Sequence, residues 1–179
     1  MVSYSELAQD AEISQPTAKA WLNILVSLGI VFLLQPYYSN QLKRIIKTPK
    51  LYFYDTGLAV WLCKWLTTET LEKGAMNGAV MENFAISEII KSYSNNGKNA
   101  NFWYYRDKEK REIDLLIEED GMIHPIEVKK SASPSKYMIS NFSVLKNANL
   151  KIGSGGIVCL AQKVLPLDEN NTVIPIGLI

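Results

Sequence analysis

The chain has 179 residues and a formal net charge of +1; 47% of the residues are hydrophobic and 21% are charged. This composition supports a packed core and excludes intrinsic disorder. The near-zero charge excludes a global attraction to nucleic acid, so binding would depend on local basic patches. We expect a cytoplasmic protein without a membrane span, because no apolar run of about 18 residues and no signal-peptide pattern occurs.

The first 66 residues predict a winged helix-turn-helix unit with a trailing helix. Ser14-Gln15-Pro16 places an N-cap before a proline in the first helical turn, and Gly29 suits the end of that helix. A shorter helix precedes it, and runs 30–34 and 43–54 are expected to form the wing strands. Such units bind DNA or pack against other proteins, and both interpretations stay open.

Basic side chains near aromatic ones suit contacts to a phosphate backbone. They occur on the second helix, along the wing and at the end of a later strand. A charged loop follows this strand, and the alternative interpretation is that the loop is simply exposed to solvent. The predicted nucleic-acid-binding residues are Lys19, Lys43, Arg44, Lys47, Lys50 and Arg106.

A polar segment divides the chain in two. Residues 67–77 show no apolar stripe and are predicted to link a domain at 1–66 to a domain at 78–179. Cys63 and Cys159 lie in apolar runs on either side, and we expect both to be reduced core residues.

Residues 78–93 predict a helix with one unusual carboxylate. Glu82 is aligned with the apolar stripe, where a carboxylate is costly unless it is paired or bound to metal. A position at the rim of the stripe, or a pair with Lys129, is the alternative. The stripe consists of Ile86, Ile89, Ile90 and Tyr93.

Asp120-Gly121 predicts a two-residue hairpin turn. Asp114 then lies opposite Glu127, and Glu112 lies opposite Lys129, with all four side chains on one face. Facing carboxylates repel each other, and bound magnesium or manganese would relieve the repulsion. A solvated hairpin face is the alternative. The residues expected on the other, core face are Ile113, Leu115, Ile117, Ile126 and Val128.

The remainder predicts a helix over 136–146, a buried strand over 156–161 and an edge pair at 164–167 and 173–176. A strand–helix–strand crossover should make the second hairpin strand and the strand at 156–161 parallel neighbours.

Asp114, followed thirteen residues later by Glu127-Val128-Lys129, resembles the Asp…Glu-x-Lys signature of the PD-(D/E)XK nuclease superfamily, with Ile113 in place of its proline. The order helix, three strands, helix, strand is similar to the α-βββ-α-β core of that superfamily. The string from Lys47 to Ala59 resembles a hallmark of an uncharacterised prokaryotic domain. That domain typically follows an AAA-type ATPase module in the same polypeptide and ends in a nuclease-like fold.

The resemblance implies an α/β (α+β overall) fold, with a winged helix followed by a restriction-endonuclease-like domain of mixed sheet and flanking helices. It implies catalytic roles for Glu82, Asp114, Glu127 and Lys129, with magnesium or manganese held by the three carboxylates. Glu82 matches the helix glutamate of the Holliday-junction-resolvase-like branch. The resemblance also implies that this chain is the C-terminal piece of a longer ATPase, although no Gly-x-x-x-x-Gly-Lys-Ser/Thr loop is present and no ATP site is expected.

We therefore expect a DNA-associated module with a magnesium-dependent phosphodiesterase site. A non-catalytic DNA- or protein-binding regulatory domain of the ATPase is the alternative, and a dimeric transcriptional regulator is a third. The sequence leaves the oligomeric state open.

Overall fold

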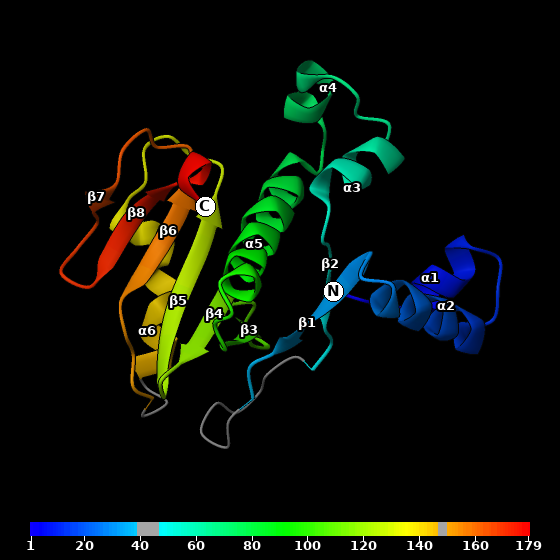
Figure 1. Cartoon of the computed structure of the whole chain (residues 1–179), viewed down its shortest axis with the longest axis horizontal. Coiled ribbons are helices and arrows are strands. Elements are labelled where there is room, and N and C mark those ends of the chain that lie inside the picture. Colours follow the sequence, from blue (N-terminus) through cyan, green and yellow to red (C-terminus); the bar gives the residue numbers. More distant parts are fainter. Residues whose placement is uncertain (39–46, 147–149) are drawn as a thin grey trace.

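The computed structural model describes residues 1–38, 47–146 and 150–179, and this part of the chain forms a mixed α/β fold (Figure 1). Its single mixed sheet has eight strands in the order β2-β1-β3-β4-β5-β6-β8-β7. The strands are β1 Val31–Pro36, β2 Lys50–Phe53, β3 Asn101–Arg106, β4 Glu112–Glu119, β5 Met122–Lys129, β6 Gly155–Cys159, β7 Leu165–Pro166 and β8 Asn171–Pro175. The α-helices are α1 Tyr4–Asp10, α2 Gln15–Ser27, α3 Thr56–Leu62, α4 Thr68–Lys73, α5 Asn77–Asn95 and α6 Ser143–Lys146, and the 3₁₀ helices are η1 Lys136–Phe142 and η2 Ile176–Leu178.

The sheet has a core on each face. The α5-side core joins Ala85, Ile86 and Ile90 of α5 to the strands, including Leu115 and Val128. The η1-side core covers the other face and joins η1 and α6 to β3, β4 and β6, with Phe142, Leu145, Leu116, Ile157 and Cys159 among its members. Of the carboxylates placed between α5 and the strands, Asp114 is buried and Glu82 and Glu112 are half-buried.

The predicted hairpin turn is confirmed. Asp120 and Gly121 have φ values of 51° and 72°, the left-handed conformation that a two-residue type I′ turn requires. The β4–β5 ladder then follows the expected register from Glu119↔Met122 to Leu115↔Ile126. The parallel pairing of β5 with β6 and the antiparallel pair β7–β8 are confirmed as well.

The expected faces of β4 are wrong at one end. Ile113 belongs to the η1-side core and Leu115 to the α5-side core, although residues i and i+2 of a regular strand point to the same face. The reason is a register shift against β3, because Trp103 pairs with Leu116 while Tyr105 pairs with Ile113. Three residue steps along β4 thus lie opposite two residue steps along β3. This extra residue is a β-bulge, which bends β4 near Asp114.

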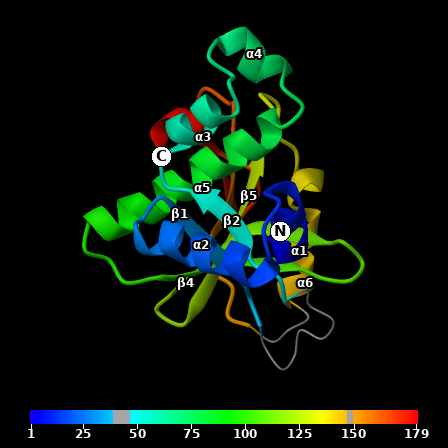
Figure 2. The ribbon, with the colours of Figure 1, turned by 90° about the vertical axis from the view of Figure 1, so that its right-hand side faces the viewer.

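The N-terminal strands are part of the main sheet. β1 pairs with β2 in the antiparallel sense and with β3 in parallel through Gln35↔Trp103 and Pro36↔Tyr104. Figure 2 shows α1 and α2 beside these strands. Phe32, Leu34 and Tyr52 enter the α5-side core, so the expected wing and the rest of the chain share packing. Of the expected second wing strand, only Lys50–Phe53 is a strand, and 39–46 lie outside the described residues.

The predicted ends of two helices are confirmed. Ser14 and Asp55 cap α2 and α3 as predicted, and Gly29, with φ 67°, follows α2.

The expected linker contains α4, which is stabilised by a capping box at Thr67. Cys63 is exposed, contrary to expectation, because α3 buries none of its residues, whereas Cys159 is buried.

The predicted helix at 136–146 is α-helical only in α6. Its first seven residues form the 3₁₀ helix η1, whose buried side chains Ile139 and Phe142 are three residues apart. A spacing of three suits 3₁₀ geometry, which brings residues i and i+3 onto one line.

Among the helices of the described residues, none is both long enough and apolar enough to cross a membrane.

Asn83 connects α5 to the N-terminal strands. Its Oδ1 accepts from the Phe53 N–H at 2.7 Å, and its Nδ2 donates to the Phe53 carbonyl at 3.0 Å and to Thr56 Oγ1 at 2.8 Å. Because Asn83 is 8% exposed, these bonds satisfy backbone groups of β2 that water reaches poorly.

We predict that Asn83→Ala lowers the free energy of unfolding by about 2–3 kcal/mol, because both backbone groups of Phe53 lose a buried partner. Urea unfolding followed by circular dichroism measures the change. The control is Asn95→Ala at the exposed end of the same helix, which should change stability by less than about 0.5 kcal/mol. Equal effects of the two substitutions would contradict this role of Asn83.

Candidate functional site

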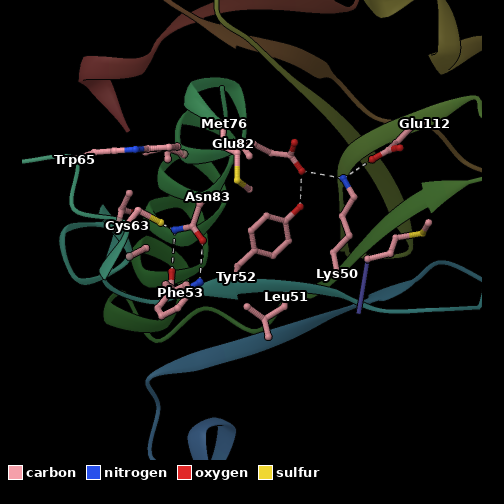
Figure 3. Close-up of a pocket in the computed structure, with 15 residues that line it drawn as sticks. Lys50, Leu51, Tyr52, Phe53, Cys63, Trp65, Met76, Glu82, Asn83 and Glu112 are labelled. Atoms are coloured by element: carbon pink, nitrogen blue, oxygen red, sulfur yellow. Dashed lines mark hydrogen bonds and ion pairs between the residues drawn. The ribbon is translucent and has the colours of Figure 1, made fainter. Parts of the chain in front are cut away.

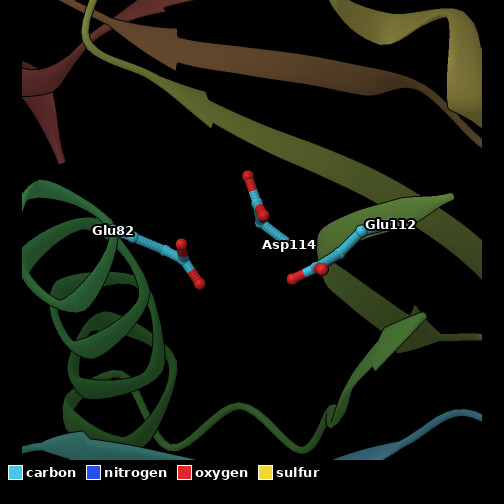
Figure 4. A group of neighbouring side chains, drawn as sticks. All are labelled: Glu82, Glu112 and Asp114. Atoms are coloured by element: carbon cyan, nitrogen blue, oxygen red, sulfur yellow. The ribbon is translucent and has the colours of Figure 1, made fainter. Parts of the chain in front are cut away.

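Three carboxylates meet where α5 crosses the bent end of β4 (Figure 4). Glu82 comes from α5, and Glu112 and Asp114 come from β4 with their carboxylates turned toward Glu82. Each offers an oxygen within 4.8 Å of the other two. Glu112 and Asp114 are two residues apart on the strand, and the helix places Glu82 across from them.

Lys50 of β2 lies among these carboxylates (Figure 3). Its Nζ is 2.8 Å from Glu82 Oε1 and 3.9 Å from Asp114 Oδ1, and it also forms an ion pair with Glu112. The residue is only 8% exposed, and its Nζ lies 5.4 Å from the centre of the Tyr104 ring. Burial alone would lower the pKa of Lys50, but Glu82 and the other two carboxylates raise it above its ordinary value.

Tyr52 stands beside Lys50 on the same face of β2. Its hydroxyl donates to Glu82 Oε1 at 2.5 Å, the oxygen that also accepts from Lys50. Burial, followed by the charge of Glu82, raises the pKa of Tyr52, which keeps the hydroxyl protonated and available as a donor. Glu82 is therefore held in place by two donors from the N-terminal part of the chain.

Asp114 lies in a gap between β4 and β5. The β4–β5 ladder ends at Leu115↔Ile126, one pair before the expected Asp114↔Glu127, and Asp114 Oδ2 instead accepts from the Val128 N–H at 2.9 Å. The Asp114 carboxylate thus replaces a backbone acceptor for the Val128 N–H at the point where β4 and β5 separate. This position lets Asp114 face Lys50 with one oxygen and Lys129 with the other, at 3.9 and 3.8 Å.

Glu127 and Lys129 form a second group on the far side of Asp114. The Lys129 ammonium pairs with Glu127 Oε1. The neighbours of Glu127, Ile126 and Val128, both belong to the α5-side core, so strand alternation turns Glu127 away from α5. The expectation that all four predicted residues share one face is therefore wrong, although Asp114 touches both groups.

Glu127 is a deeply buried carboxylate that is incompletely compensated. It is 4% exposed, and its Oε2 is buried without a hydrogen-bond partner among the described residues. Burial, followed by the charge of Asp114, raises the pKa of Glu127 well above the ordinary range. Burial, followed by the charge of Glu82, raises the pKa of Asp114 as well. Both carboxyls would be stabilised by more positive charge than Lys129 supplies.

Arg106 binds the outer side of the cluster through its Nη1, 2.8 Å from Glu112 Oε2. A cavity of about 470 Å³ adjoins the inner side and is bounded by β2, α3 and α5 (Figure 3). Lys50, Glu82 and Glu112 line one end of it, and apolar side chains such as Trp65 and Met76 line the rest. The cavity therefore borders Glu82 and Glu112 of the cluster.

The predicted site residues fall into three groups according to where they lie in the structure. Glu82, Asp114, Glu127 and Lys129 converge on one region, although Glu127 is outside the three-carboxylate group. Lys50 and Arg106 were expected to contact DNA but are ion-paired within this region. Lys19 and Lys47 are exposed, and Lys43 and Arg44 lie outside the described residues.

The sequence did not predict that Glu112, Tyr52 and Lys50 belong to the site. For Glu112 an indication was present, because it lies two residues before Asp114 in a strand. Lys50 and Tyr52 also alternate on one face of β2. No local pattern places that face against α5, because this depends on the pairing of β1 with β3.

The residues present fit a divalent cation. Hard cations take oxygen ligands, and Glu82, Glu112 and Asp114 offer three carboxylate oxygens in one place. The unpartnered Oε2 of Glu127 adds an independent indication, because a buried carboxylate oxygen is expected to have a hydrogen-bonding or metal partner.

Comparison with known proteins shows the family. A family model described as Domain of unknown function (DUF4143) matches residues 77–179, more than half of the chain, and the chain belongs to this family. A second model, Domain of unknown function (DUF8612), matches residues 1–69. No solved structure gives a significant match.

Two curated relatives are similar over nearly the whole chain. They are uncharacterized proteins of Mycobacterium bovis and Mycobacterium tuberculosis, each 28% identical over 175 residues, which is 98% of this chain. The chain spans only 38% of the length of these relatives.

We predict that Glu127→Gln stabilises the metal-free protein at pH 8 by about 1–3 kcal/mol and has little effect near pH 4. The raised folded-state pKa of Glu127 contributes stability that is present below the ordinary carboxyl pKa and is lost as pH rises through the folded value. The glutamine removes this loss.

Urea unfolding in the presence of EDTA, at several pH values, measures the difference. The control is Glu169→Gln at an exposed glutamate, which should show no pH-dependent gain. A Glu127→Gln protein that is less stable than wild type at pH 8 would contradict the assignment of electrostatic strain to Glu127.

Proposed function

We propose that this chain is a cytoplasmic DNA-associated module whose buried carboxylates form a metal-dependent phosphodiesterase site. The observation that carries the proposal is the gathering of Glu82, Glu112 and Asp114 oxygens within 4.8 Å of one another. The Glu127–Lys129 pair on the far side of Asp114 adds a buried carboxylate oxygen without a hydrogen-bond partner among the described residues. A fold keeps such an arrangement at a cost to stability, which is typical of a functional site.

We also propose that the fold is a PD-(D/E)XK-like domain preceded by a winged helix. The succession of α5, β3, β4, β5, the η1–α6 crossover and β6 supports this assignment, because it follows the α-βββ-α-β order. Fold similarity does not establish activity, which depends on the residues of the site.

Asp114 is the central ligand in this proposal, since it lies between the two groups of carboxylates. Glu82 and Glu112 on one side and Glu127 on the other are the candidates that would complete the coordination. A bound magnesium or manganese ion would supply Lewis-acid stabilisation of the scissile phosphate and lower the pKa of the attacking water.

Lys129 has the position of an electrostatic stabiliser. Its side chain is 39% exposed, while Asp114 and Glu127, with which its ammonium pairs, are almost fully buried, so Lys129 lies at the border between the buried carboxylates and solvent. There it can donate to a phosphate oxygen as negative charge develops. Arg106, whose Nε is buried without a hydrogen-bond partner among the described residues, is a second cation near Glu112.

The N-terminal part supports the DNA component of the proposal. Lys19 on α2 and Lys47 before β2 are exposed, and the Lys47 ammonium lies 5.7 Å from the centre of the Tyr38 ring. Exposed lysines near aromatic rings can bind phosphates without reading sequence.

A second candidate is a non-catalytic regulatory domain, favoured by two observations. Lys50 forms ion pairs with all three carboxylates, so the cluster could serve as an internal ion-pair network. The helix α2 also exposes Trp21, Ile24 and Leu28 at helical spacing, a surface suited to a protein partner. The resemblance described above points to an ATPase module as that partner, and the greater length of the mycobacterial relatives is compatible with one.

We predict that the protein cleaves DNA in the presence of magnesium or manganese, and that Asp114→Asn and Lys129→Ala each lower the rate by about 100-fold or more. Single-stranded, duplex and branched DNA are the substrates, and cleavage is measured on gels. The control is Lys91→Ala, which breaks the Lys91–Glu88 ion pair on α5 and should leave the rate unchanged. Activity that persists unchanged in both site variants would end the catalytic proposal.

We predict that Lys19→Ala and Lys47→Ala each weaken binding to a duplex of mixed sequence. Each should also reduce the slope of log affinity against log salt by about one, because one phosphate contact is lost. Fluorescence anisotropy at several salt concentrations measures both quantities. Lys163→Ala, an exposed lysine after β6, is the control, and an equal effect there would show that binding is not directed to the N-terminal part.

A further inference from the structure

The cation at the centre of the carboxylate cluster comes from β2. Lys50 contacts all three residues that gather as metal ligands, Glu82, Glu112 and Asp114, while the residue is almost fully buried. We propose that the Lys50 ammonium occupies the position of the divalent cation, so that metal binds only when Lys50 is displaced. This inference rests on the proposed metal site.

The contacts of Lys50 suit an ammonium ion. Its Nζ lies 2.8 Å from Glu82 Oε1, the length of a charge-assisted N–H···O bond, and it also forms an ion pair with Glu112. Magnesium binds oxygens at about 2.0–2.1 Å, so an ion at the position of this ammonium would require Glu82 and Asp114 to move closer. The three carboxylates are thus arranged around Lys50 in the present structure.

Lys50 and a divalent cation exclude each other for electrostatic reasons as well. Both would lie within a few ångströms of Asp114 in a poorly solvated region, where like charges repel strongly. Four carboxylates of this region, Glu82, Glu112, Asp114 and Glu127, are paired among the described residues with three cations. Removal of Lys50 would leave a larger excess of negative charge, which a divalent cation would compensate.

The position of Lys50 is set by the N-terminal part of the chain. Lys50 pairs with Leu34 in the β1–β2 ladder, and the preceding Pro49 accepts a hydrogen bond from the Val2 N–H at 2.8 Å. β1 in turn is joined to β3 by two residue pairs. A partner that shifts the N-terminal strands would therefore withdraw Lys50, and binding at this part of the chain would be linked to metal binding. Lys50, Glu82 and Glu112 line the adjoining cavity, so it borders two of the carboxylates that Lys50 would vacate.

The test compares manganese binding by wild type, Lys50→Met, Lys50→Arg and Lys91→Met, using calorimetry on the full chain. Lys50→Met keeps much of the apolar length of the side chain and removes its charge. We expect it to bind manganese at least tenfold more tightly than wild type. Lys50→Arg and Lys91→Met should bind as wild type does, since the first keeps a cation at the site and the second removes one elsewhere on α5.

Thermal unfolding with and without manganese is the second readout, and it applies even if Lys50→Met is poorly stable. The variant should melt below wild type in EDTA and regain stability as manganese is added, with a larger shift than wild type shows. Adding Asp114→Asn to Lys50→Met should abolish the shift.

The outcomes separate this inference from the proposed function. Equal manganese affinity in wild type and Lys50→Met would overturn the inference and leave the metal site in place. No binding by either protein would overturn both. A gain in Lys91→Met equal to that in Lys50→Met would also overturn the inference, because the effect would then reflect overall charge.

Discussion

The structure depends on the burial of several carboxylates beside a small number of cations. Glu82, Glu112 and Asp114 lie close enough to repel one another, and Lys50 makes their proximity tolerable. Because isolated charges are costly in a poorly solvated region, α5, β2 and β4 must be held in register for any of them to be stable. The ion-pair network therefore specifies how the N-terminal strands meet the rest of the sheet, in addition to whatever chemistry it performs.

The bend in β4 has a similar importance. A regular strand would have paired Asp114 with Glu127 and placed both carboxylates on one surface. The shifted register against β3 instead turns Asp114 into the gap between strands, where the Val128 N–H binds it. The same irregularity separates Ile113 from Leu115 into two cores. One displaced residue thus sets both the packing and the position of the central carboxylate.

Features that depend on nearby residues could be predicted from the sequence. The Asp120-Gly121 turn and the Asp55 cap were expected because each follows from the conformations and hydrogen bonds of adjacent residues. Lys50 could not be placed, since its neighbours are determined by the pairing of β1 with β3, some 70 residues apart in sequence. The exposure of Cys63 depends likewise on whether another element covers α3, which an apolar run alone does not reveal.

The partners in the Lys50 network come from the two segments that different family models match. The cation lies within residues 1–69, and the three carboxylates lie within 77–179. A change of charge in one segment at this point would therefore require a compensating change in the other. A gene fusion that exchanged one segment for an unrelated sequence would leave buried charge without compensation, and inheritance of the two as a unit is the simplest way to preserve both.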